Sequence, residues 1–296
     1  MTDAAAEEPS QSSWLALAAL LGGACIIGLA AILVRMSDAG PAATGVWRLI
    51  FAMPLLALMT WRTAGSIGGP PRMALWAGLF FALDLGFWHY GIQYTSVANA
   101  TVLTNLTPVV VTAFAWIFLR QRPRALFLVA VAAAVGGASL MAYAKGGGAL
   151  RNQPLGDALS VATAFWYALY FLTMAEGRRT EGASRMMFWA GVAGLPLLLG
   201  AALLLGEPLT PASATGWAAC AGLGLMHVAG QGSIAWAMGR LPTSTASVVV
   251  LVQPVVAAWL GWLLFAEAIG PLQALGAAVT LGGVVLAQWV SRKKAG

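Results

Sequence analysis

The chain consists of ten long apolar runs, separated by short connections that hold its turns and most of its charged residues. A bilayer core is roughly 30 Å thick and needs about 20 apolar residues per helix, which is close to the length of each run. The runs are 14–34, 43–61, 74–94, 97–119, 125–144, 155–175, 185–205, 215–238, 244–265 and 271–290. They predict an all-α integral membrane protein with ten transmembrane helices.

The composition excludes a soluble protein of this length. Only 9% of the residues are charged and 60% are hydrophobic, whereas about 25% are charged in a typical soluble protein. Most of the surface must therefore face lipid, so we expect a lipid bilayer and no nucleic acid as a partner. Cys25 and Cys220 lie inside apolar runs without the spacing of a metal site, and we expect neither a metal nor a cofactor.

The Lys and Arg residues predict the orientation, because cytoplasmic connections are enriched in them. Three lie in connections on the side away from the termini: Arg35, Lys145 and Arg151. Twelve lie on the side that holds both termini: Arg62, Arg72, Arg120, Arg122, Arg124, Arg178, Arg179, Arg185, Arg240, Arg292, Lys293 and Lys294. We expect both termini to be cytoplasmic and the protein to reside in the inner membrane. Residues 1–13 contain no Lys or Arg, so a cleaved signal peptide is not expected.

The second half of the chain repeats the first at an offset of 146 residues. Without a gap, Pro108-Val109-Val110 aligns with Pro254-Val255-Val256, and Gly136-Gly137 aligns with Gly282-Gly283. Each half has five helices, an odd number, so the second half must enter the membrane from the opposite side. The prediction is two inverted five-helix repeats around a central cavity, an architecture typical of secondary transporters.

The repeat sets the expected organisation of the chain. It comprises a cytoplasmic tail (1–13), a first five-helix repeat (14–146), a second five-helix repeat (147–290) and a basic cytoplasmic tail (291–296).

Two related stretches lead into the repeated helices: Tyr94-Thr95-Ser96 with Leu106-Thr107-Pro108, and Leu241-Pro242-Thr243-Ser244 with Val252-Gln253-Pro254. With the ten helices in two halves, they resemble the drug/metabolite transporter superfamily, and more narrowly the EamA-type exporters. The resemblance covers essentially the whole chain. It implies export of small metabolites, and for some members of the family the export of aromatic amino acids.

Polar groups inside a membrane are costly, so each is a candidate for function. The predicted cavity residues are Asp84, Trp88, His89, Thr101, Asn105, Thr163, Tyr167, Tyr170, His227 and Gln231. Asp84 is the carboxylate farthest from any helix end, and the repeat offset places it one turn from His227, so the two are expected to face each other. A structural charge paired to a neighbouring helix is the alternative. Either histidine has the chemistry of a proton relay, although a histidine in a helix more often only hydrogen-bonds a neighbour.

Two stripes of polar and aromatic residues lie at helical spacing. One contains Thr163, Tyr167 and Tyr170, and the other contains Thr101 and Asn105. They predict a wet cavity wall, with helix packing as the alternative. Pro108 and Pro254 are predicted hinges at matched positions, because each removes a backbone hydrogen bond; a fixed kink is the alternative.

Ala132 with Gly136, and Ala278 with Gly282, form a repeated small-residue pattern that predicts close helix packing. We expect this packing inside the bundle; packing between protomers is the alternative, so the protein is expected to be a monomer or a homodimer.

The solute is expected to be small and amphipathic. Met226 and six aromatic side chains are expected around it: Trp88, Tyr90, Trp166, Tyr167, Tyr170 and Trp236. No Lys or Arg is expected at mid-depth. Phosphorylated cargo needs basic clamps, so amino acids and organic cations are favoured over it. The alternatives are a membrane enzyme and a non-transporting scaffold. An enzyme lacks support because the sequence contains no His-Glu-x-x-His, Cys-x-x-Cys, Gly-x-Ser-x-Gly or phosphate-binding Gly-Lys-Ser/Thr motif, and a scaffold does not explain the repeat.

Overall fold

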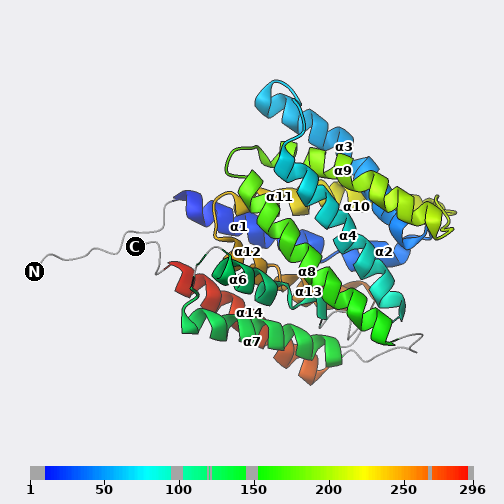
Figure 1. Ribbon diagram of the computed structural model, residues 1–296. Coiled ribbons are helices and arrows are strands. Elements are labelled where there is room, and N and C mark those ends of the chain that lie inside the picture. Colours follow the sequence, from blue (N-terminus) through cyan, green and yellow to red (C-terminus); the bar gives the residue numbers. More distant parts are fainter. Residues whose placement is uncertain are drawn as a thin grey trace, which may run out of the picture.

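The computed structural model describes residues 11–94, 103–118, 120, 122–144, 153–265 and 269–292, and these ranges are helical with no strand. Figure 1 shows one bundle in which the start of α1 and the end of α14 lie at the same end. The elements are α1 (Gln11–Ile27), α2 (Ala30–Met36), α3 (Pro41–Ala64), α4 (Arg72–Tyr94), α6 (Thr107–Ile117), α7 (Ala125–Ala144), α8 (Gln153–Gly177), α9 (Ala183–Leu204), α10 (Ala214–Met226), the π-helix η1 (His227–Gln231), α11 (Gly232–Met238), α12 (Thr243–Val249), α13 (Val252–Phe265) and α14 (Pro271–Arg292).

Ten membrane helices can be counted in the described ranges, so the predicted number is confirmed. Four are made of shorter pieces: α1 with α2, the segment that ends in α6, α10 with η1 and α11, and α12 with α13. Six segments are long and apolar enough to cross a bilayer by themselves: Trp14–Val34, Pro41–Ala64, Pro154–Gly177, Ala183–Leu204, Thr243–Leu260 and Pro271–Val290. The apolar helices Thr107–Ile117 and Ala125–Met141 are shorter.

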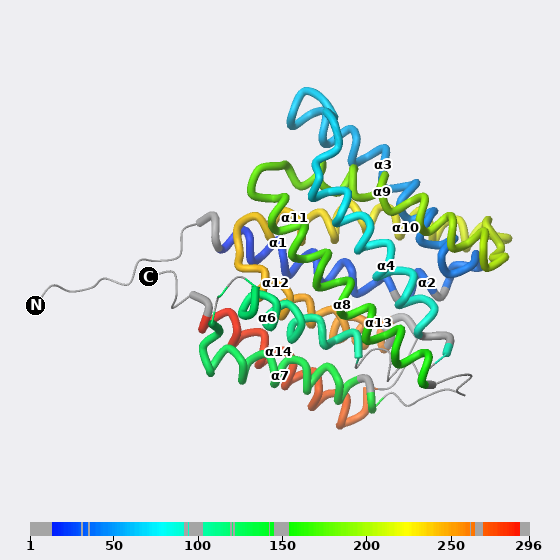
Figure 2. The backbone as a smooth tube through the Cα atoms, viewed as in Figure 1, coloured from blue at the N-terminus to red at the C-terminus, as the bar shows by residue number. Residues whose placement is uncertain are grey.

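Helices α7 and α14 lie side by side along one edge of the bundle (Figure 2), where two glycines let them touch. A Cβ on Gly137 would lie 2.5 Å from the backbone nitrogen of Thr280, and one on Gly283 would lie 2.5 Å from that of Ala134. These two contacts are equivalent at the repeat offset, and the helices run antiparallel. The contact therefore has the symmetry of two inverted repeats, as predicted.

The predicted packing of this pattern inside the bundle is wrong by one residue in each half. Ala132, Gly136, Ala278 and Gly282 are exposed on the outside of the α7–α14 pair. A Cβ on Gly136 or Gly282 would meet nothing within 4 Å. One residue along a helix is a rotation of about 100°, so the second glycine of each pair faces the partner helix and the first faces outward.

The symmetry extends to α3 and α9. Gly45 of α3 faces Leu198 of α9, and Gly191 of α9, its equivalent at the repeat offset, faces Leu49 and Met53 of α3. These contacts between the halves hold α3 against α9 in the same antiparallel sense as α7 and α14.

Both predicted hinge helices are interrupted just before their prolines. The turn at 105–106 precedes α6, in which Pro108 occupies the first turn, and the turn at 250–251 precedes α13, which contains Pro254. Proline has no N–H to donate and crowds the preceding turn, which accounts for a break at this point. The break is present in both halves, and a hinge motion there stays a prediction.

Candidate functional site

Arg48 and Asp84 place two opposite charges inside the bundle. Arg48 lies on α3 with 5% of its surface exposed, and Asp84 lies on α4 with 9% exposed. The charge of each residue acts electrostatically on the other. The charge that acts on the Asp84 carboxylate is that of Arg48, and the pairing of Asp84 with His227 stays a prediction. The expectation that no basic residue lies among the cavity residues is wrong, because Arg48 is buried inside the bundle.

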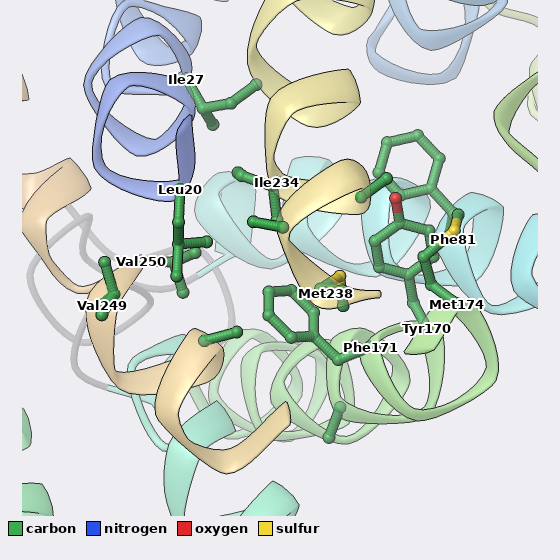
Figure 3. Packing of buried hydrophobic residues seen from close by; sticks show 14 of the residues in the cluster. Leu20, Ile27, Phe81, Tyr170, Phe171, Met174, Ile234, Met238, Val249 and Val250 are labelled. Carbon is green, nitrogen blue, oxygen red and sulfur yellow. The ribbon is translucent and has the colours of Figure 1, made fainter. Parts of the chain in front are cut away.

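The ring of Phe81 connects this pair of charges to the other half of the chain. Phe81 lies one turn before Asp84, and the guanidinium carbon of Arg48 is 5.5 Å from the centre of its ring. The same ring is 5.0 Å from the ring of Tyr170 and 5.2 Å from that of His227. Figure 3 shows Phe81 and Tyr170 next to each other, with Met174 beside them. Two predicted site residues, Tyr170 of α8 and His227 of η1, therefore meet at this ring, together with Arg48 of α3.

His227 and Gln231 are the first and last residues of the π-helix η1. A π-helical turn interrupts regular α-helical pairing and changes the direction in which side chains point, and such turns are frequent at functional sites. The side-chain amides of Gln231 and Gln253 lie near the Tyr167 hydroxyl, and the Tyr167 ring stacks on that of Tyr170 with their centres 5.8 Å apart. Tyr167 thereby joins the cluster, which we call the central cluster: Arg48, Phe81, Asp84, Tyr167, Tyr170, His227, Gln231 and Gln253.

Four polar atoms of the central cluster are buried and make no hydrogen bond in the structure. They are Nε of Arg48, Nδ1 of His227, Oε1 of Gln231 and Nε2 of Gln253. Buried polar groups in proteins are almost always paired, so a concentration of unpaired ones calls for water or a ligand. Both donors and acceptors are present among them, which matches a ligand that carries both kinds of group.

The structure does not bring every predicted residue into the cluster. His89 is buried with both ring nitrogens unpaired, beside the half-buried ring of Trp88 at 5.1 Å, and the charge of Arg48 acts on it through space. Asn105 is buried with its Nδ2 unpaired. The hydroxyl of Thr163 donates to the carbonyl of Leu159 in its own helix, at 3.0 Å. Thr101 lies outside the described residues.

Tyr90 and Trp236 lie away from the central cluster, at the two ends of the bundle. Tyr90, near the end of α4, donates to the carboxylate of Glu207 in the connection from α9 to α10. Trp236 lies under Arg240, whose guanidinium carbon is 3.7 Å from the centre of a Trp236 ring. Their predicted place in the cavity wall stays a prediction. Trp166 packs between Phe80 and Phe87 with its indole nitrogen unpaired.

Three members of the central cluster were missed as site residues. Arg48 had a clear signal, because a charge inside an apolar run is as costly as that of Asp84. Gln253 had a weaker one, as an amide directly before the repeated Pro254. Phe81 had none, because aromatic residues are common throughout the apolar runs.

Comparison with known proteins places this site in a family. The model of the EamA-like transporter family matches residues 13–143 and again 154–289. An uncharacterized transporter from Archaeoglobus fulgidus is 26% identical over 273 residues, which cover 91% of this chain and 95% of the relative. A solved crystal structure has the same fold, with a TM-score of 0.79 and 17% identity, covering 98% of this chain and all of the other. Two matches to one family model, one for each half, show that the chain belongs to the EamA-like transporter family.

Proposed function

We propose that this membrane transporter exports small amphipathic metabolites, foremost amino acids with large side chains, by alternating access. The observation that carries the proposal is the central cluster, because helices of both inverted halves contribute to it. In transporters built from inverted repeats, substrate sites lie between the repeats near mid-membrane. Movement of one repeat against the other opens such a site to one side of the membrane and then to the other.

The chemistry of the cluster favours an amphipathic solute. Phe81, Tyr167 and Tyr170 offer ring faces, and the unpaired atoms of His227 and Gln231 offer hydrogen bonds. Anionic cargo was disfavoured because no basic residue was expected among the cavity residues. The buried Arg48 removes that argument. Asp84 nearby still repels a phosphorylated solute, so cargo without net charge is favoured. The direction of transport is inferred from the resemblance to exporters.

The experiment is a flux measurement on purified protein in liposomes. We expect saturable movement of labelled phenylalanine or threonine, well above the leak of protein-free liposomes. Repeating it with an imposed pH gradient shows whether protons drive transport. Flux of organic cations alone would reassign the cargo. No flux across a panel of amino acids, organic cations and phosphorylated sugars would overturn transport of small metabolites.

A further inference from the structure

Arg48 and Asp84 are a buried pair of opposite charges that can still bind a ligand. A charge in the membrane interior is stable only when an opposite charge, a polar group or water compensates it. For each of these two groups, the opposite charge that acts on it belongs to the other, on the neighbouring helix. In the described part of the chain, however, no direct salt bridge or hydrogen bond joins them, and Nε of Arg48 has no partner.

Two opposite charges held near each other without contact favour one class of ligand. A net anion is attracted by Arg48 and repelled by Asp84, and for a net cation the two effects are reversed. A zwitterion satisfies both, because its carboxylate and ammonium groups sit on one carbon atom. The guanidinium group also presents parallel N–H donors that suit a carboxylate.

We propose that Arg48 binds the α-carboxylate and Asp84 binds the α-ammonium group of an amino acid, which bridges the two side chains. This assignment rests on the proposed function and names the residues that select its substrate class. The Phe81 ring lies between the Arg48 guanidinium and the rings of Tyr170 and His227, so an apolar substituent on the same carbon reaches an aromatic surface. The unpaired nitrogen of His227 and oxygen of Gln231 come from the opposite half and complete the polar contacts.

The experiment compares the binding of three solutes to the purified transporter by titration calorimetry. Phenylalanine carries both charges, phenethylamine lacks the carboxylate and 3-phenylpropionate lacks the ammonium group. We expect the wild type to bind phenylalanine at least about tenfold more tightly than either analogue, because each analogue leaves one buried charge without a partner.

Variants assign each charge to its residue. Arg48→Gln is expected to lose the preference for phenylalanine over phenethylamine, and Asp84→Asn the preference over 3-phenylpropionate. Arg48→Lys should retain part of the first preference, since it keeps the charge but loses the paired donors. Arg62→Gln is the matched control, because Arg62 lies on the same helix but is exposed near its end. It should leave all three affinities unchanged.

The outcomes separate this proposal from the proposed function. A wild type that binds either analogue as tightly as phenylalanine overturns the zwitterion assignment without any variant. Folded variants that keep both preferences, or that lose affinity for all three solutes equally, reduce the pair to a structural role. If a single variant does not fold, Arg48→Gln combined with Asp84→Asn removes both buried charges together, and both preferences should then vanish. A wild type that carries other solutes but binds no amino acid overturns the zwitterion assignment and reassigns the cargo, while transport of small metabolites stands.

Discussion

Gly136 and Gly137 are neighbours on α7 with opposite surroundings, and this makes them a sensitive test of the packing. Gly137 lies against the backbone of α14, while Gly136 faces open space. Gly137→Val should destabilise the protein by roughly 1–3 kcal/mol, because the new side chain can fit only if the two helices separate. Equilibrium unfolding in mixed micelles measures the change.

The control is Gly136→Val, one residue away in the same helix, which should change stability far less. Gly283→Val and Gly282→Val repeat the comparison in the second half of the chain. Equal losses at the two positions of a pair would contradict the packing of α7 on α14 described above.

Residue-level detail was the part of the molecule that the sequence predicted least well. The repeat at 146 residues contains both glycines of each Gly-Gly pair, so it does not show which of them faces α14. In the same way it placed Asp84 near His227 but did not show that Phe81 faces His227. Rotation of a helix about its axis is set by side-chain packing across the whole interface, which a pattern within one helix does not contain.

At the scale of elements, the connection from α9 to α10 holds the start of α3. The Glu207 carboxylate accepts backbone N–H groups of Ala42, at 3.3 Å, and Ala43, at 3.0 Å, and it also accepts the hydroxyl of Tyr90. The first N–H groups of a helix have no partner within it and carry a partial positive charge, so a carboxylate is favoured there. This contact joins the two halves at the end of the bundle remote from the termini.

Glu207→Gln is expected to lower the free energy of unfolding by about 1–2 kcal/mol, because the amide loses the charge and one acceptor oxygen. Tyr90→Phe tests the same network, and the two changes together should cost less than the sum of the single losses. Glu176→Gln is the control, since Glu176 pairs with Arg179 only on the exposed surface. Additive effects of the two network variants would show that Tyr90 and Glu207 are not coupled.

Asp38 lies at the same end and stays charged at neutral pH. A hydrogen bond with Ser213, the largest cause, holds the pKa of Asp38 below its usual 3.8, and the backbone N–H of Ala212 acts in the same direction. A carboxyl group whose pKa is lower in the folded state stabilises the fold above its unfolded pKa. The contribution is lost as the pH falls through the lower, folded value. Asp38 therefore helps to hold this end together across the neutral range.

At the scale of the whole molecule, the ten helices and the inverted repeat follow from properties that a sequence displays directly. The length of an apolar run is a local feature, and the count of five helices per half alone requires the inversion. Only some of the breaks inside the helices could be predicted from the sequence. Those before Pro108 and Pro254 have a local cause, whereas nothing in the sequence around His227 marks a π-helix.

Orientation in the membrane is the remaining prediction at this scale, and it follows from the charge count of twelve against three. Single cysteines test it in a Cys25→Ala, Cys220→Ala background. Ala212 and Gly182 are both exposed in connections at opposite ends of the bundle. A membrane-impermeant maleimide should label Ala212→Cys in intact cells, but Gly182→Cys only after the cells are permeabilised. The reverse pattern would place the termini outside. Labelling of both in intact cells would mean that the chain inserts in two orientations, which so strong a bias of basic residues should prevent.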